Sequence, residues 1–166
     1  RRYLARWSSV FNAAQVEDVC LSPSGLLATA RPETIIVIHS TVGPAVCRKL
    51  AAAARSRGVH VIDAGVSGGP VGAEAKTLSL MVGGPAALLD RCRSLFASYA
   101  SNVHHMGEEI GSGQIAKALN NHAYFCNLFV VDEILRVAKS AGVSIDAMLD
   151  VVNSSSGQSW ASDHWR

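Results

Sequence analysis

Residues 34–63 read TIIVIHSTVGPAVCRKLAAAARSRGVHVID, and this stretch decides the fold. Thr34–Ser40 is a β-branched run without polar alternation, which predicts a strand that is covered on both faces. Val46–Arg57 is rich in Ala, Leu, Lys and Arg and predicts a helix, which Gly58 ends as a C-terminal cap. Val59–Asp63 predicts the next buried strand. Strand, helix and strand at this spacing form a βαβ unit, so we expect an α/β fold with a doubly wound parallel sheet.

The same pattern continues on both sides of this unit. Ala14–Cys20 predicts a short helix upstream, and Ala64–Gly72 predicts a glycine-rich loop downstream. Thr77–Val82 and Asn102–Met106 predict two further strands, and a helix from Pro85 to about Tyr99 separates them. We expect these elements to extend the same sheet.

After residue 110 the sequence predicts helices only. An uninterrupted helical pattern covers residues 114–141, and a second helix follows at 145–152. A helix of about 28 residues is ~42 Å long, which is more than a small sheet needs. We therefore expect two domains: residues 1–109 with the sheet, and residues 110–166 as the start of an all-α domain with a long central helix.

This long helix is apolar almost all round. Its large apolar residues are Ile115, Leu119, Tyr124, Phe125, Leu128, Phe129, Val130, Val131, Ile134 and Leu135. Such a helix is typically buried on several sides, so we expect it to pack against its own sheet, other helices or another subunit.

Composition excludes several classes of function. The chain has 166 residues, 49% of them hydrophobic, and a net charge of +2 without any run of Lys or Arg, so we expect no nucleic-acid partner. No apolar stretch is long enough to span a bilayer, so we expect no membrane partner. Cys20, Cys47, Cys92 and Cys126 are widely spaced and predict buried free thiols in a reducing compartment, hence a cytoplasmic protein. Arg1–Phe11 is basic and lacks acids, as in a piece of a targeting peptide, but it has no full apolar signal core. Because no Met begins it either, we interpret it as the edge of a longer chain.

The segment Asp63-Ala-Gly-Val-Ser-Gly-Gly69 is the first candidate for chemistry. Open α/β sheets bind ligands at loops that leave the C-terminal ends of buried strands. Ser67 supplies a hydroxyl, and Gly68 and Gly69 allow backbone N–H groups to approach an anion closely. A small carboxylate fits such a cradle, although an ordinary glycine-rich turn would have the same composition.

The second candidate is Gly111-x-Gly113-x-x-x-Lys117-x-x-x-Asn121. Lys117 and Asn121 are four residues apart, so they share one helical face. The neighbours of Lys117 are apolar, and a desolvated lysine has a lowered pKa that suits proton transfer near neutrality. Alternatively, the stem of Lys117 packs on apolar surface while its ammonium reaches water.

Histidines offer no metal site. His104 and His105 are adjacent and lack a third ligand at metal spacing, so we expect a structural role and no zinc. His39 stands beside the turn at residues 40–44, where we expect a hydrogen-bonded histidine at a strand end.

Taken together and in this order, the motifs resemble the β-hydroxyacid dehydrogenase family, over nearly the whole chain. His39–Val42 is similar to the family's Ser-Thr cofactor motif, and Asp63–Gly69 to its substrate signature, which Leu80–Gly84 continues. Gly111–Asn121 is similar to its catalytic motif, and Asn153–Gly157 to a loop of its helical domain. The family includes 3-hydroxyisobutyrate dehydrogenase and tartronate semialdehyde reductase and, more distantly, 6-phosphogluconate dehydrogenase.

The resemblance implies a Rossmann-type domain, an NAD or NADP cofactor and a role for each matching residue. Lys117 would be the general acid/base of hydride transfer between NAD(P) and a small 3-hydroxy acid or its semialdehyde. Asn121 would hydrogen-bond the substrate, residues 67–69 would hold its carboxylate, and Thr41 would contact the cofactor. It also implies a homo-oligomer, a dimer or tetramer, built through the helical domain.

Two departures from the family pattern matter. Gly65 stands where the family usually has Pro, which we expect to loosen the loop and alter substrate choice. The dinucleotide fingerprint G-x-G-x-x-G is absent, so we expect a βαβ unit of ~30 residues upstream of this sequence and more helical domain downstream. By itself the chain should then be inactive and bind no cofactor. Two alternatives remain: an imine-reducing relative, a group that generally lacks the lysine, and a non-catalytic dimerising module of the same fold.

Overall fold

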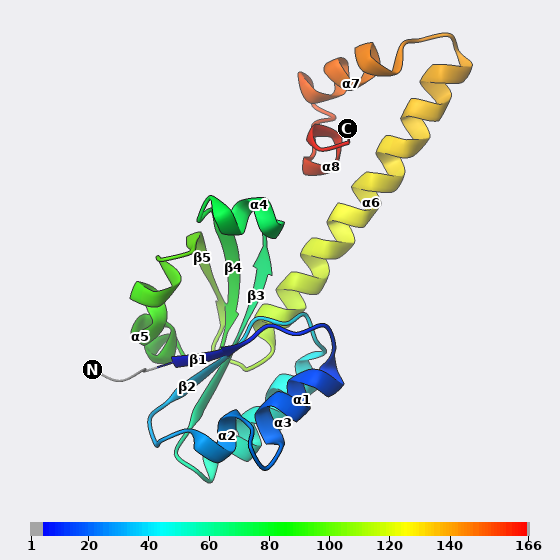
Figure 1. Cartoon of the computed structure of the whole chain (residues 1–166). Coiled ribbons are helices and arrows are strands. Elements are labelled where there is room, and N and C mark those ends of the chain that lie inside the picture. The colour runs from blue at the N-terminus through cyan, green and yellow to red at the C-terminus, as the bar shows by residue number, and fades with distance from the viewer. Residues whose placement is uncertain (1–4, 166) are drawn as a thin grey trace. The chain divides into compact units, whose positions relative to one another are not determined.

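The computed structural model describes residues 5–165, apart from the side chains of Trp7 and Ser8 (Figure 1). The chain forms two compact units, one up to Ala118 and the other from Leu119. Within residues 5–165, no helix combines the length and the apolar character that a membrane span requires.

The first unit contains a sheet of five strands in the order β1-β2-β3-β4-β5. The strands are β1 (Ala5–Ser8), β2 (Ile35–Ile38), β3 (His60–Ser67), β4 (Leu78–Gly83) and β5 (Ala100–Gly107). β1, β2 and β3 run parallel, as do β4 and β5, whereas β3 and β4 are antiparallel. The expected sheet is therefore present but mixed, and the prediction of an entirely parallel sheet was wrong.

The connection between β3 and β4 explains the antiparallel pair. A parallel crossover needs a dozen residues or more, and only residues 68–77 separate these strands. They form the short helix α4 (Gly69–Glu74) and a turn at Lys76, which has a φ of 58°. The predicted loop at Ala64–Gly72 is thus the end of β3 followed by α4.

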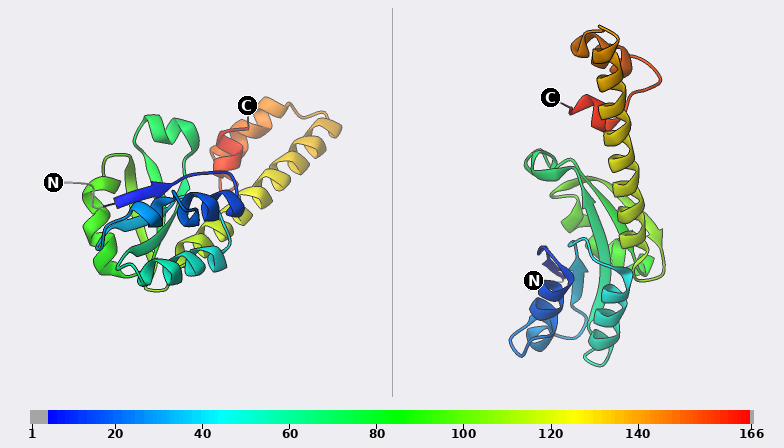
Figure 2. Two further views of the ribbon diagram at one scale, coloured as in Figure 1. Left: turned by 60° about the horizontal axis from the view of Figure 1, so that its bottom comes forward. Right: turned by 90° about the vertical axis from the view of Figure 1, so that its right-hand side faces the viewer.

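Helices cover both faces of the sheet (Figures 1 and 2). On one side lie α1 (Ala13–Leu21), α2 (Leu26–Thr29) and α3 (Pro44–Arg55), and on the other lies α5 (Ala86–Phe96).

The strand β2 contributes side chains to the two hydrophobic cores, one on each face of the sheet. Ile36 and Ile38 join the cluster of the first three helices, while Ile35 and Val37 join that of α5. All four residues are buried, which confirms the prediction of a doubly covered strand.

Two details differ from the sequence-based expectations for this unit. No helix or strand was predicted within Arg1–Phe11, yet Ala5–Ser8 pairs with β2 along the register Ala5↔Ile35. Cys20, Cys47 and Cys92 are buried free thiols as expected, and burial raises the pKa of Cys20 to about 11. Cys126 is exposed, so the expectation of burial was wrong for this thiol.

The second unit is entirely helical. α6 (Ser112–Ser140) begins in the first unit and continues into the second, where α7 (Ile145–Asn153) and α8 (Trp160–Asp163) follow. The core of this unit consists of Val131, Leu135, Leu149 and Ala161. Other large apolar side chains of α6 are exposed, namely Leu119, Phe125, Phe129, Val130 and Val137. Burial of α6 on several sides, expected from the sequence against its own sheet, other helices or another subunit, therefore stays a prediction for these exposed residues.

Candidate active site

The side chain of Asp63 connects the sheet to the start of α6 by hydrogen bonds. The carboxylate is 0% exposed on β3. Its Oδ1 accepts the Gly111 N–H at 2.5 Å, and its Oδ2 accepts the Gln114 N–H at 2.7 Å. Gln114 lies in the first turn of α6 and Gly111 directly before it, at the helix N-terminus where a negative charge also interacts favourably with the helix dipole. Burial raises the pKa of Asp63, and the backbone N–H donors oppose that shift.

Two glycines let the first turn of α6 lie directly on β4. A Cβ added at Gly113 would overlap the Met81 carbonyl oxygen, and one added at Gly83 would lie 2.6 Å from the Gly113 nitrogen. Real Cβ atoms do not approach other atoms so closely. The backbones of helix and strand are therefore in contact, which is the structural reason for glycine at position 113.

Gln114 ties the same turn of α6 to the loop after β2. Its side chain is 1% exposed; Nε2 donates to the Ser40 carbonyl at 2.9 Å, and Oε1 accepts the Val42 N–H at 3.0 Å. Thr41, the predicted cofactor contact, lies between these two anchors and is exposed. Sequence reasoning missed Gln114, although a polar residue that enters an apolar helix next to a glycine motif was an available signal.

Lys117 follows on the next turn of α6. Its side chain is half-buried, and this burial lowers its pKa because the ammonium is partly desolvated. None of the acidic side chains in the described part of the chain forms an ion pair with it. The lysine stem lies on β3 at Gly65, where an added Cβ would be 2.7 Å from the Lys117 Cβ. Gly65 is thus a buried strand residue paired with Met81, and the expectation that it loosens a loop was wrong.

The predicted carboxylate cradle lies at the end of β3. Ser67 is half-buried and shares the strand face of Asp63 and Gly65, because side chains alternate along a strand. Ser67 is two residues beyond Gly65, a rise of about 6.6 Å.

The two glycines of the cradle differ in what surrounds them. Gly68 has a φ of 121°, and a Cβ there would lie 3.1 Å from Leu78 Cδ2. Gly69 has a φ of 59°, and no described atom lies within 4 Å of the place a Cβ would take. Both glycines are exposed, and at Gly69 the side of the backbone that a Cβ would occupy is open as well.

Asn121 lies one turn beyond Lys117 on the unbroken helix α6, so the two residues share a helical face. It is half-buried and belongs to the residues of the second unit.

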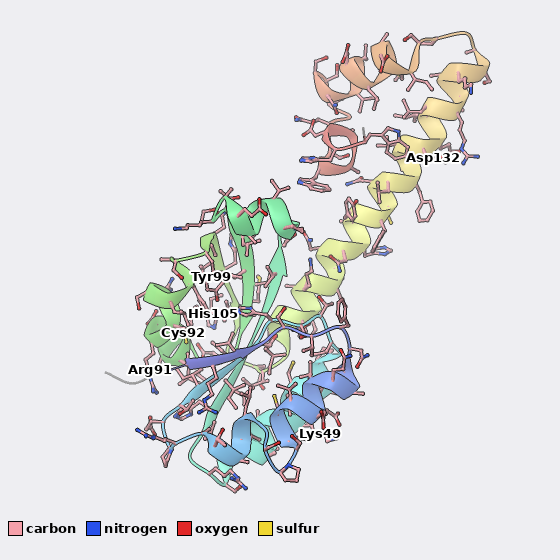
Figure 3. The ribbon with its side chains drawn as sticks, viewed as in Figure 1. Lys49, Arg91, Cys92, Tyr99, His105 and Asp132 are labelled. Atoms are coloured by element: carbon pink, nitrogen blue, oxygen red, sulfur yellow. The ribbon has the colours of Figure 1, made fainter. Side chains whose placement is uncertain are left out.

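The histidines have structural partners. Figure 3 labels His105 and also Tyr99, the partner of His39. His39 bonds to the Ala64 carbonyl through Nδ1 at 2.8 Å and to the Tyr99 hydroxyl through Nε2 at 2.9 Å, which confirms the prediction of a hydrogen-bonded histidine at a strand end. Burial lowers the pKa of His39. Because a carbonyl oxygen only accepts, Nδ1 is the donor in the bond to Ala64. His105 bonds to the Gly84 carbonyl at 2.8 Å. Over the described residues, no three His, Cys, Asp or Glu side chains come together as a metal site.

Comparison with known families now adds to this geometry. Residues 5–107 match the family model described as the NAD binding domain of 6-phosphogluconate dehydrogenase. Residues 111–165 match the family model described as NAD-binding of NADP-dependent 3-hydroxyisobutyrate dehydrogenase. The chain belongs to the β-hydroxyacid dehydrogenase family. Both matched segments are NAD(P)-binding domains of these dehydrogenases.

Individual relatives and solved structures agree with this assignment. An NAD-dependent L-serine dehydrogenase of Pseudomonas aeruginosa is 39% identical over 92% of this chain and 51% of its own length. The structure of 3-hydroxyisobutyrate dehydrogenase from Mycobacterium tuberculosis with L-serine is 32% identical, with a TM-score of 0.84 over 95% of this chain and 53% of that one. A protein named Psf3, solved with NADP+ and 2-OPP, is 31% identical, with a TM-score of 0.88 over 96% and 56% of the two chains. The chain thus spans about half the length of the dehydrogenases that it matches.

The loop after β2 suits the cofactor of these dehydrogenases. Thr41 presents an exposed hydroxyl, and no described atom lies within 4 Å of the place a Cβ would take on Gly43. A polar group and an accessible backbone at the C-terminal end of a parallel strand fit part of a dinucleotide.

Proposed function

We propose that this chain supplies the general acid/base of an enzyme that transfers a hydride between NAD(P) and a small 3-hydroxy acid or its semialdehyde. The observation that carries the proposal is the half-buried Lys117, whose pKa is lowered by desolvation and whose stem lies against β3. Two residues further along the same strand face stands Ser67, so a proton-transfer group and a polar cradle share one side of the sheet.

The proposed chemistry is a proton transfer at Lys117 Nζ. NAD(P), when bound, accepts the hydride in oxidation and supplies it in reduction. In oxidation, neutral Lys117 takes the proton of the 3-hydroxyl group while the carbon–oxygen double bond forms. In reduction, the Lys117 ammonium returns a proton to the new alkoxide, so the charge on oxygen is never left unneutralised.

The cradle would fix the substrate by its carboxylate. The Ser67 hydroxyl and the backbone at Gly68 and Gly69 are the proposed donors, and the open side of Gly69 supports close approach there. Asn121, on the helical face of Lys117, would hydrogen-bond the substrate. Thr41 would contact the cofactor from its loop, which Gln114 holds in place at both ends.

The organisation of the whole protein belongs to the same proposal. We assign residues 1–109 to a partial NAD(P)-binding domain and residues 110–166 to the start of a helical dehydrogenase domain. Exposed apolar side chains on α6, such as Phe125 and Phe129, support a homo-oligomer formed through the helical part. Buried free thiols such as Cys47 support a reducing, cytoplasmic compartment.

Hydride transfer measured by nicotinamide absorbance in the complete gene product tests the function. L-serine and 3-hydroxyisobutyrate, each with NAD and with NADP, are the first substrates to try. Lys117→Ala should lower turnover by about 10²-fold or more, the scale for losing a general acid/base. Lys139→Ala, a change at an exposed lysine on the same helix, is the matched control. Turnover by Lys117→Ala equal to that of the control would refute the role, and absence of hydroxy-acid turnover in the wild type would favour a non-catalytic module.

A further inference from the structure

Gln114 joins two parts of the chain that the proposed function uses separately. It stands on α6 three residues before Lys117, so the two residues lie on the same side of the helix. Its Nε2 donates to the Ser40 carbonyl at 2.9 Å, and its Oε1 accepts the Val42 N–H at 3.0 Å. These two backbone groups flank Thr41, so one carboxamide holds the loop after β2 on both sides of the proposed cofactor contact.

The two contacts need both ends of a carboxamide. A carbonyl oxygen only accepts and an N–H only donates, so the side chain must offer a donor and an acceptor at once. Because the side chain of Gln114 is 1% exposed, water can hardly replace either bond. An apolar residue of the same length would fill the space and lose both attachments of the loop.

The helix turn that carries Gln114 is fixed to the sheet by other groups. Asp63 Oδ2 accepts the Gln114 backbone N–H at 2.7 Å, and the backbone of Gly113 lies directly on β4. The side chain of Gln114 therefore attaches the loop to a turn that does not depend on that side chain for its own place. Its loss should release the loop and leave Lys117 beside β3.

The attachment reaches a second loop through Ser40. Ser40 Oγ accepts the Val10 N–H at 2.7 Å, in the segment between β1 and α1. β1 and β2 are parallel neighbours in the sheet, and ligands of open α/β sheets lie beyond the carboxyl ends of such strands. Gln114 thus connects the ends of two parallel strands to the helix of the lysine.

We propose that Gln114 is a positioning residue for the cofactor: it holds the loop after β2 against the lysine helix and so sets where Thr41 places the nicotinamide relative to Lys117. This inference rests on the proposed function for the roles of Thr41 and Lys117. Gln114 is too buried to touch a ligand and acts only through the loop. The spacing Gly111-x-Gly113-x-x-x-Lys117 leaves position 114 open, so the assignment belongs to this chain and does not follow from the motif.

The kinetic consequence is specific to the cofactor. A loop released from Gln114 must be ordered again when NAD(P) binds, which weakens binding, and it places the nicotinamide less accurately, which slows hydride transfer. The substrate cradle stands on β3 and keeps its place. In Gln114→Met we expect the Kd for NADH or NADPH to rise about tenfold and kcat to fall about tenfold, while KM for the hydroxy acid at saturating cofactor stays within about twofold.

Titration of the complete gene product with NADH and NADPH, followed by nicotinamide fluorescence, measures cofactor binding without turnover. Ile35→Val is the matched control for lost stability, because Ile35 is buried at the opposite end of β2 from the loop. A double-mutant cycle with Thr41→Val tests the route. If Gln114 acts through the loop, the rise in Kd for the double variant should be smaller than the product of the two single effects.

A measurement on the wild type keeps the inference falsifiable if Gln114→Met folds poorly. The side-chain N–H₂ protons of buried Gln114 should exchange with water far more slowly than those of exposed Gln158, which provides the internal reference in an NMR spectrum. Saturating NADH should slow the exchange of Gln114 further, because a bound cofactor holds the loop that this side chain bonds.

Three results would each overturn the positioning role: equal Kd for the cofactors in Gln114→Met and Ile35→Val, fully multiplicative effects of Gln114→Met and Thr41→Val, or exchange at Gln114 that NADH leaves unchanged. None of them would touch the proposed function, which fails instead if Lys117→Ala turns over normally. A raised Kd, a lowered kcat and an unchanged KM for the hydroxy acid would establish Gln114 as the residue that positions the cofactor.

Discussion

Replacing Asp63 by Asn should loosen the start of α6. The two side chains have nearly the same shape, so the change removes a charge and turns one acceptor oxygen into an N–H₂ donor. One of the two buried donors, the N–H of Gly111 or of Gln114, then faces another donor. The substitution therefore tests the fastening of the helix without opening a cavity.

The magnitude follows from those contacts. A buried donor left without an acceptor costs about 1–3 kcal/mol, and the loss of a negative charge at a helix N-terminus costs about 0.3–2 kcal/mol. Relief of a buried charge works in the opposite direction, since burial raises the pKa of Asp63. We expect a net loss of about 2 kcal/mol in the free energy of unfolding, in the lower half of the combined range.

Amide hydrogen exchange measures this loss of stability directly at the start of α6. A loss of 2 kcal/mol corresponds to roughly 30-fold faster exchange, because 1.4 kcal/mol is a factor of ten, and the Gly111 and Gln114 amides should show it at neutral pH. Urea unfolding followed by circular dichroism gives the global value. Asp90→Asn is the control, because this exposed residue forms a surface ion pair with Arg93 and such pairs are worth about 0–1 kcal/mol. If the two amides exchange no faster in Asp63→Asn than in the control, the carboxylate does not hold the helix and the reasoning is refuted.

Three further outcomes are expected. Gly69→Ala should raise KM for the hydroxy acid and lower the free energy of unfolding by about 1–2 kcal/mol, the cost of a left-handed alanine. Gly68→Val should destabilise the fold, because its side chain would collide with Leu78. Equal KM for Gly69→Ala and wild type would place the cradle elsewhere. Gln114→Leu should speed exchange of the Val42 amide, which loses its buried acceptor, and unchanged exchange would remove Gln114 as the anchor of the Thr41 loop. The pKa of Lys117 in the folded chain lies below that of an unfolded lysine, so between these two pKa values the unfolded chain binds more protons. The free energy of unfolding should therefore rise with pH from the folded pKa up to the unfolded value of about 10.4. Urea midpoints over a pH series should show that rise in the wild type and not in Lys117→Met, and identical pH dependences would contradict the shift.

The sequence predicted the elements with strong local signals. The β-branched run at Thr34–Ser40 and the glycine after Arg57 placed β2 and α3 within a few residues, because burial on both faces and helix capping leave local patterns. The apolar pattern at 114–141 likewise predicted α6, which runs from Ser112 to Ser140. Strand direction was not predicted between β3 and β4, since it depends on the short α4 that the glycines of residues 68–72 concealed.

In the candidate site, too, some residues could be predicted from local sequence patterns and others could not. Lys117 and residues 67–69 are visible as short patterns, because glycine and a lone lysine in apolar surroundings are locally distinctive. The contacts of Asp63, Gln114 and Gly65 were not predictable, because each is made with a segment some 50 to 74 residues away. Such contacts exist only once the sheet has brought the ends of β2, β3 and β4 to the start of α6.

The central claim is that Lys117 exchanges the substrate proton during hydride transfer. Chemical rescue of Lys117→Ala in the complete gene product tests it most directly, because the truncated side chain leaves space where a small primary amine can act. The rate of NAD(P)H formation from the hydroxy acid should rise in proportion to the free-base concentration of added methylamine or ethylamine, and its pH dependence should follow the pKa of the amine used. Wild-type rates in Lys117→Ala together with no response to either amine would contradict the claim.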